Sequence, residues 1–277
     1  YKNKDIQINE AFKIGYKELI QRLLLKEDYK KLSTSNLDQI KELISYYQII
    51  DSIEEDQNNQ TTKINIYFDK KKIHNFFFKR NILYSDIINS EIIIFPFLIM
   101  DNQNFIYSKN YFYKNWNQGK ENSKELIKYI LPAESIESIQ KIKNLDDNII
   151  DLDVIDFFKE YDFKNMVFTT IQIKDKNAKI FLNANIEGKK INKNLIINRK
   201  NLSQEQFNKK IIFEIKDILV DLIKSQNLID VRTPSFLNVE LQLKNKKNNL
   251  VEFDNRVRKI DLIDSFFVQQ LNKNYAL

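Results

Sequence analysis

The chain has 277 residues, with 44 Lys or Arg against 38 Asp or Glu, one His, no Cys, three Gly and three Pro. A chain of this length forms one large domain or two ordinary ones, each able to bury a core. Without Cys it has no disulfide, no thiolate metal site and no Cys nucleophile. Three glycines are too few for either common glycine-rich phosphate loop, which excludes nucleotide chemistry through those motifs.

The net charge of +6 and the pI near 9.0 would suit a nucleic-acid or membrane-surface partner. Lys far outnumbers Arg, however, and the basic residues are mixed with Asp and Glu, the densest runs being 70–72 and 244–247. Arg is the better residue for bidentate phosphate contacts. The residues enriched here also have A/T-rich codons. We therefore interpret the lysines as solvated surface and expect no nucleic-acid partner.

The N-terminal part of the chain alternates between helical and strand patterns. Apolar side chains at helical spacing predict an amphipathic helix over 9–30, and a second helix is predicted over 36–50 with Ser35 as its N-cap. A polar loop over 54–62 leads into a strand at 64–68, where apolar residues alternate with polar ones. A short helix then follows over 71–79.

The middle of the chain contains the most apolar run, residues 91–99, which is apolar at both alternating sets of positions and predicts a central strand. Pro96 has no N–H to donate, so pairing there should be interrupted or one-sided. No apolar run approaches the roughly 20 residues that span a bilayer. A turn at 102–104 then leads into a strand through residues 106 and 107.

Further along, helices are predicted over 122–131 and 153–161, followed by a three-stranded meander and the longest helix, over 203–227. The expected strands of the meander cover 166–174, 179–187 and 190–198. Ser203 and Gln206 have the spacing of a capping box for the long helix. After Pro234 an alternating strand (237–243), a helix (250–260) and a strand (265–271) complete a β-α-β unit.

These patterns predict an α+β protein: a mixed sheet with helices packed on one or both faces, plus a smaller C-terminal β-α-β unit of ferredoxin-like character. The expected domains are residues 1–233, with a further division near 101–150, and residues 234–277, a truncated unit. Because the chain begins with Tyr1 instead of Met, we expect a fragment or a processed product.

Few residues could carry chemistry. His74 lies in a predicted short helix, and one His supplies neither a His-rich metal site nor an identifiable triad. Five aspartates form the densest carboxylate group: Asp146, Asp147, Asp151, Asp153 and Asp156. They lack calcium-loop spacing, and the last two fit the start of a helix, so capping is the favoured interpretation. A divalent-cation site using Asp146, Asp147, Asp151 and Asp153 remains an alternative.

An aromatic segment supplies the remaining candidate site. Its members could form an interaction surface or stack the bases of a single strand beside Lys109 and Lys114. They are Tyr107, Tyr111, Phe112, Tyr113 and Trp116. Packing in a core or between domains is the favoured interpretation of these side chains.

The order of elements resembles that of the DUF2066 family, uncharacterised bacterial proteins usually made with a signal peptide. The similarity runs through residues 11–24, 64–68 and 73–81, and the run Ile92-Ile93-Ile94-Phe95-Pro96-Phe97 resembles the family's "vLP" strand. Asn110-Tyr111-Phe112 with Trp116 resembles its Asn-Pro-Trp and following Trp, although Tyr111 and Phe112 replace Pro and the first Trp. Pro132 with Ile136 and Glu137 resembles its Pro-x-Gly-Asp segment, in which Glu134 and Ser135 replace the Gly-Asp pair.

The resemblance implies a periplasmic or cell-envelope protein, with a signal peptide and one further strand before Tyr1. The family's first unit is similar in layout to small α/β binding modules of the envelope. Together with the shortage of catalytic residues, this leads us to expect a non-enzymatic protein, without catalytic residues, cofactor or metal, that binds a partner protein. The alternatives are a metal-dependent hydrolase with a carboxylate-only site and a single-stranded nucleic-acid-binding protein.

Overall fold

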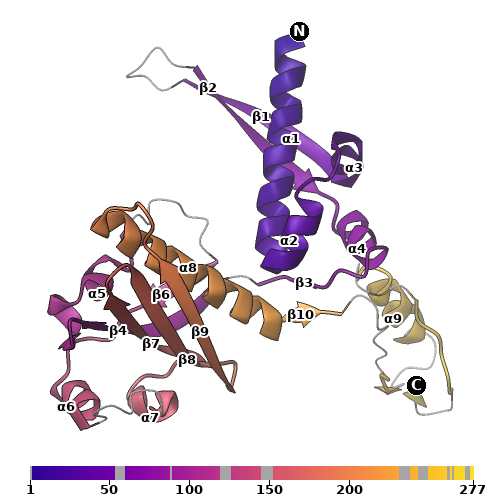
Figure 1. The fold of residues 1–277 in the computed structure, drawn as a ribbon. Helices are drawn as coiled ribbons and strands as arrows, with labels where there is room; N and C mark the ends of the chain where they lie inside the picture. The colour runs from indigo at the N-terminus through magenta and orange to yellow at the C-terminus, as the bar shows by residue number, and fades with distance from the viewer. Residues whose placement is uncertain are drawn as a thin grey trace. The chain divides into compact units, whose positions relative to one another are not determined.

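The structure is a computed structural model, and it shows an α+β fold with a mixed sheet and packed helices (Figure 1). The residues it describes are 2–53, 60–87, 89–118, 126–144, 152–230, 238–242, 249–260, 263, 265–271 and 275–277. The chain divides into two compact units. The first unit comprises Tyr1–Lys13, Ser35–Leu83 and Asp230–Leu277, and the second comprises Ile14–Thr34 and Tyr84–Ile229. Pro234 lies outside the described residues, so the boundary expected there stays a prediction.

The first unit contains an antiparallel ribbon of strands β1 (Ile44–Ile53) and β2 (Gln60–Phe68). Helix α3 (Leu37–Leu43) precedes the ribbon and helix α4 (Lys70–Phe78) follows it. The ribbon contacts the middle of helix α1 (Lys2–Leu23), where the rings of Phe12 and Tyr47 meet edge to face with 5.2 Å between their centroids.

The helix predicted over 36–50 is wrong beyond Leu43, because the residues that follow form β1. Ile44, Tyr46 and Tyr47 have β-branched or aromatic side chains, which suit a pleated strand. Residues 44–50 fit both a helical and a strand pattern, and pairing with β2 favours the strand. The N-cap is also Asn36 in place of Ser35: the Asn36 side chain accepts a hydrogen bond from the Gln39 N–H at 2.8 Å.

The C-terminal segment of the first unit keeps the predicted order of strand, helix and strand. Its elements are β11 (Leu241–Gln242), α9 (Asn249–Val257) and β12 (Tyr275–Ala276). Residues 265–271 do not form the expected strand: apart from an isolated bridge at Leu271, the pairing with β11 comes from β12, and it is antiparallel.

The second unit contains a six-stranded mixed sheet in the order β5-β4-β7-β8-β9, with β6 also paired to β4 (Figure 1). The strands are β4 (Ser90–Met100), β5 (Gln103–Phe105), β6 (Ile127–Ile130), β7 (Asn165–Lys174), β8 (Asn177–Ile186) and β9 (Lys189–Asn198). The meander β7-β8-β9 is therefore confirmed. Its second turn has positive φ at Glu187 (49°) and Gly188 (80°), as a tight hairpin turn requires.

The second unit also contains helical segments and, among its described residues, two short strands that pair with each other. They are α2 (Lys26–Leu32), β3 (Tyr84–Ser85), a 3₁₀ turn η1 (Tyr107–Lys109), α5 (Tyr111–Asn115), α6 (Ile136–Asn144), α7 (Val154–Phe157), α8 (Gln204–Gln226) and β10 (Leu228–Ile229). The capping box of α8 is confirmed, since Ser203 and Gln206 bond each other's backbone N–H. The helix predicted over 9–30 is instead split between α1 and α2.

The helix predicted over 122–131 is wrong for residues 127–130, which form β6. These residues pair in parallel with the start of β4, where Ile127 and Tyr129 are buried and Lys128 is exposed. A four-residue segment with this alternation satisfies strand and helix patterns almost equally well, and the free edge of β4 settles the choice.

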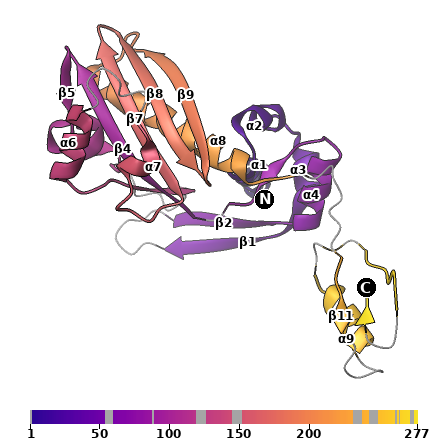
Figure 2. The same ribbon diagram turned by 90° about the horizontal axis from the view of Figure 1, so that it is seen from below.

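Strand β4 packs on both faces. On one face its side chains join α8 and α5 in a core that includes Trp116, Phe207 and Leu219. On the other face Phe95 and Phe97 join α6 and α7, and Phe168 stacks on Phe95 at 5.5 Å between ring centroids. Figure 2 shows the helices on the two sides of the sheet. A strand buried on both faces explains the continuous apolar run in the sequence.

Pairing at Pro96 is one-sided, as predicted. On one side β4 pairs with β7 without interruption, including Pro96 opposite Thr169. On the other side β6 pairs with residues 90–93 and β5 with residues 98–100, so no strand of the described part of the chain pairs with Pro96 there. The Asn110 side chain fills part of this gap by donating to the Pro96 carbonyl at 2.7 Å.

Replacing Phe168 by Ala should lower the free energy of unfolding by about 3–5 kcal/mol, because a side chain only 1% exposed leaves a cavity between the Phe95 and Phe157 rings. Urea unfolding followed by circular dichroism measures this. Phe213→Ala is the matched control, since the Phe213 side chain is 66% exposed and its loss should change stability by about 0.5 kcal/mol or less. Equal losses in the two variants would contradict the described core.

Candidate functional site

The aromatic segment expected to form an interaction surface lies largely inside the protein. Tyr107, Phe112 and Trp116 are at most 1% exposed, so the surface interpretation is wrong for these three residues. Tyr107 belongs to the core beside α6 and α7, while Phe112 and Trp116 belong to the core beside α8. Burial on opposite faces of the sheet prevents them from forming one stacking platform.

The two remaining aromatic residues of that segment, Tyr111 and Tyr113, are half-buried. The Tyr113 hydroxyl donates to the Pro132 carbonyl at 2.6 Å, and the Tyr111 ring packs edge to face on Phe112. Both side chains are thus used in packing. The segment as a whole holds the end of the sheet together, which is the interpretation favoured from the sequence.

The carboxylate group is only partly visible, since Asp146, Asp147 and Asp151 lie outside the described residues. Asp153 is the N-cap of α7, as predicted: its carboxylate accepts from the N–H of Ile155 (2.9 Å) and of Asp156 (3.3 Å). An ion pair with Lys190 at 2.9 Å adds to these bonds and lowers the pKa of Asp153. Within the described ranges, no three His, Cys, Asp or Glu side chains lie close enough together to hold a metal ion. His74 is a half-buried residue of α4.

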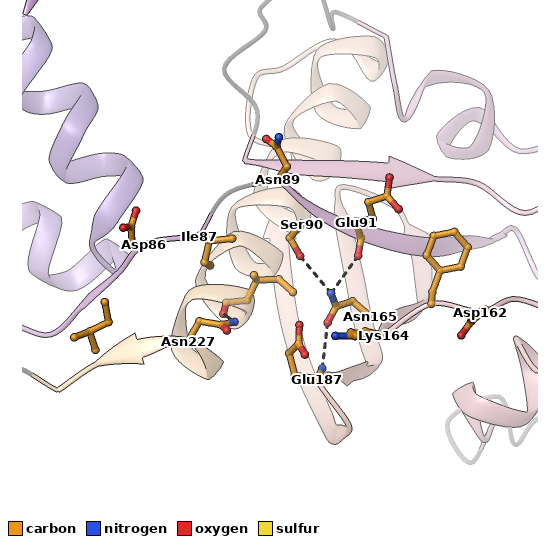
Figure 3. A pocket seen from close by; sticks show the side chains of 13 residues that line it. Asp86, Ile87, Asn89, Ser90, Glu91, Asp162, Lys164, Asn165, Glu187 and Asn227 are labelled. Atoms are coloured by element: carbon orange, nitrogen blue, oxygen red, sulfur yellow. Dashed lines mark hydrogen bonds between the residues drawn. The ribbon is translucent and has the colours of Figure 1, made fainter. Parts of the chain in front are cut away.

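A pocket of about 650 Å³ opens at the end of the sheet where β4 and β7 begin (Figure 3). Its lining is mainly polar, with the carboxylates of Asp86, Glu91, Asp162 and Glu187 and the ammonium of Lys164. These groups come from four segments of the second unit: the residues after β3, strand β4, the residues before β7 and the β8–β9 turn. The pocket could admit a small polar or cationic group, but its carboxylates do not converge on a common point (Figure 3).

Asn165 stands at the base of this pocket and is 3% exposed. Its amide nitrogen donates to the Glu91 carbonyl (3.1 Å) and the Ser90 hydroxyl (3.3 Å), and its amide oxygen accepts from the Glu187 N–H at 3.1 Å. Figure 3 shows these three bonds. They join β4, β7 and the β8–β9 turn, so Asn165 connects the strand ends and has little capacity left for a ligand.

Lys224 is a buried amine, a type of group that often marks catalytic sites. It lies on α8, is 3% exposed, and its ammonium donates to the carbonyls of Gln21 (2.6 Å) and Leu24 (2.8 Å) at the end of α1. Burial lowers the pKa of Lys224, while the nearby carboxylate of Asp221 opposes that effect. Two of its three donors thus cap a helix end, which indicates a structural role.

The outer edge of β9 is the remaining candidate site. β9 ends the described sheet, and its ten residues pair with β8 without a register shift, from Ile186 opposite Lys189 to Asn177 opposite Asn198. Its other edge has no partner strand within the described part of the chain. Lys189, Lys190 and Lys193 are exposed on this strand, and Ile196 is 66% exposed.

The face of the sheet opposite α8 packs against α6 and α7 over β4 and β7, and α7 also contacts β8. On β8 and β9 this face carries Lys179, Phe181, Asn183, Asn185, Lys190, Asn192, Asn194, Ile196 and Asn198. Four of these residues are exceptions: Asn185 is buried, Phe181 and Asn183 are half-buried, and Lys190 is ion-paired. The other side chains are exposed and have no described side-chain partner. The edge and this open face together form one accessible surface, which we call the β9 surface.

The ribbon β1–β2 is a second candidate, because neither of its outer edges pairs with another strand of the described residues. Its exposed apolar side chains are Tyr46, Tyr47, Ile49, Ile50 and Tyr67. Its strands contain one Asp and one Lys, so it offers no charge preference. The β9 surface is therefore the better-defined candidate.

No family model matches the chain, and no curated protein sequence matches it. Among solved structures, it is similar to the crystal structure of lipoprotein GNA1162 from Neisseria meningitidis, with 9% sequence identity and a TM-score of 0.26. The match covers 48% of this chain and 97% of the lipoprotein. At this TM-score the likeness supports no inference about function. Among the residues described, no helix is both long and apolar enough to cross a membrane.

Asn165→Ala should lower the free energy of unfolding by about 2–3 kcal/mol, because it leaves the Glu91 carbonyl and the Glu187 N–H without their partner. Thermal and urea unfolding measure the loss. Asn194→Ala is the matched control: Asn194 is an exposed Asn of the same sheet, and its loss should change stability by less than about 0.5 kcal/mol. A neutral Asn165 variant would contradict the connecting role.

Lys224→Met should lower the free energy of unfolding by about 1–2 kcal/mol at neutral pH, because the helix-end carbonyls lose their donor. Burial lowers the pKa of Lys224 in the folded protein. At pH values between this lowered pKa and the ordinary lysine pKa of about 10.4, the unfolded chain therefore binds more protons than the folded chain. The stability of the wild-type protein should therefore rise relative to the variant as pH increases through this window. Urea titrations at several alkaline pH values test the sign, and a difference that narrows with rising pH would contradict it.

Proposed function

We propose that this chain is a non-enzymatic protein of the bacterial cell envelope that binds a partner protein by adding a strand of the partner to β9. The observation that carries the proposal is a regular ten-residue edge strand with no partner strand in the described part of the chain. Backbone N–H and C=O groups along such an edge provide affinity for an extended segment.

The form of β9 favours this use. Proteins commonly protect sheet edges from pairing with short strands, bulges or proline. β9 is longer than the usual strand of about five or six residues, keeps its register with β8 throughout and contains no proline. Lysines are its one protective feature. An edge of this kind rejects indiscriminate association while still allowing a matched strand to pair.

The shortage of catalytic groups supports the non-enzymatic part of the proposal. One His, no Cys and three Gly leave few ways to build an active site. Lys224, the buried amine, is bonded to helix-end carbonyls. The envelope location rests on the resemblance to the DUF2066 family, and it remains part of the proposal.

A photo-crosslinking residue tests the binding edge. We expect benzoylphenylalanine in place of Ile196 to give a covalent adduct in envelope extract, because an added strand would lie beside this side chain. The same residue in place of Phe213 on α8 is the control, since both native side chains are 66% exposed. The captured partner, once purified, should slow amide hydrogen exchange across residues 189–198. Adducts at both positions, or none at Ile196, would contradict the proposal.

A further inference from the structure

The net charge of the protein is concentrated in one part of the fold. Residues 165–200, the β7-β8-β9 meander and its flanks, contain eight Lys or Arg and two Asp or Glu. This segment of 36 residues therefore carries +6, equal to the net charge of the whole chain. The other 241 residues contain 36 residues of each sign and are neutral in sum. Four of the eight basic residues lie on β8 and β9, and the others lie at the end of β7, in the β7–β8 turn or directly after β9.

We infer that the strand accepted by β9 is an acidic, extended segment of a different protein. This inference rests on the proposed function and specifies the chemistry of the partner. Strand β9 contains three lysines and no carboxylate. An acidic strand would neutralise these lysines while forming the backbone ladder, and charge complementarity would also accelerate the encounter.

The arrangement of the lysines defines a pattern in the partner. Lys189 and Lys193 lie on the same face of β9, four residues apart, which corresponds to about 13 Å along a strand. No carboxylate among the described residues forms an ion pair with either of them. A partner strand with two carboxylates four residues apart on one face would match this spacing. Lys190 is paired with Asp153, but that pair is exposed and weak enough to exchange.

A second copy of this chain fits the edge poorly. Pairing two β9 strands would bring six lysines into one ribbon without a carboxylate between them, and like charges across a strand pair are destabilising. This is the situation that lysines on edge strands normally prevent. The charge that blocks self-pairing therefore also selects an acidic partner.

Nucleic acid is a less suitable occupant of the β9 surface. Arg199, the one arginine in the meander, donates to the Leu202 carbonyl and to Gln204. The aromatic ring on the open face is Phe181, which is half-buried. Single-strand binding relies on exposed aromatic faces for base stacking. The surface supplies charge and a backbone edge, which together fit a peptide strand.

Three synthetic peptides test the inference with the full chain. The acidic probe is Thr-Val-Glu-Val-Thr-Val-Glu-Val-Thr, which places two Glu four residues apart on one face. Gln or Lys replaces both Glu in the other two probes. Fluorescence anisotropy measures affinity, and hydrogen exchange measures protection of residues 189–198. We expect the Glu probe to bind about tenfold more tightly than the Gln probe, to weaken with added salt and to protect β9.

Charge reversal provides the matched variants. Lys189→Glu with Lys193→Glu should make the Lys probe the tightest binder. Lys109→Glu with Lys114→Glu changes the net charge equally at exposed positions away from β9, and it should preserve the preference for the Glu probe. Circular dichroism and urea unfolding check that each variant keeps its fold. An equal shift of preference in the two double variants would overturn the inference.

The remaining outcomes separate this inference from the proposed function. Equal affinity of the three probes, with β9 protected, would overturn the acidic preference and leave strand addition intact. Protection by none of the probes would overturn the inference, and the crosslinking experiment would still test strand addition independently. Oligothymidylate or phosphatidylglycerol vesicles binding as tightly as the Glu probe would show general attraction to anions and overturn it. Concentration-dependent self-association that protects β9 would overturn it in favour of a second copy.

Discussion

The second unit depends on one constraint: strand β4 is apolar on both faces and must be covered on both. Its eleven residues pair with three other strands, and its side chains join two separate cores. One core needs α8 and the other needs α6 and α7. The aromatic segment between β5 and β6 follows from the same requirement, because Tyr107 packs on one side of the sheet and Trp116 on the other. Burial of β4 therefore determines where nearly every neighbouring element lies.

Buried polar groups connect the ends of this layered arrangement. Asn110 bonds the Pro96 carbonyl, Asn165 joins three strand ends, and Lys224 caps the end of α1. Each could be mistaken for a functional residue, since buried polar and titratable groups often mark active sites. Their hydrogen bonds are nevertheless made within the protein itself, mostly to its backbone. Buried polar groups need hydrogen-bond partners, and this requirement explains the three residues without a ligand.

The cover over the second face ends before the sheet does. α6 and α7 lie over β4 and β7, and α7 also contacts β8, while β9 presents exposed and mainly polar side chains on that face. Strands β8 and β9 belong to residues 165–200, the segment whose net charge equals that of the whole chain. An edge strand, an open face and a local charge excess thus coincide at one side of the sheet. This coincidence distinguishes the β9 surface from the electroneutral ribbon β1–β2.

The sequence by itself determined the elements whose hydrophobic pattern fits only one type of secondary structure. The doubly apolar run of β4, the alternating strands of the meander and the capping box of α8 could each be recognised because period and end signals agree. The Asp153 cap and the one-sided pairing at Pro96 followed from local chemistry in the same way. A count of charge by segment would also have revealed the basic meander, which the chain-wide mixture of Lys with Asp and Glu concealed.

Tertiary structure decided the conformation or burial of the segments whose local pattern fits two alternatives. Residues 44–53 and 127–130 became strands because a neighbouring strand offered backbone partners, which no periodicity reveals. The aromatic residues at 107–116 became core because the sheet needed cover on both faces, although their composition also suits an exposed platform. The role of β9 as an edge likewise depended on strand order. Pairing and burial are relations between distant residues, and for that reason only the folded chain could determine them.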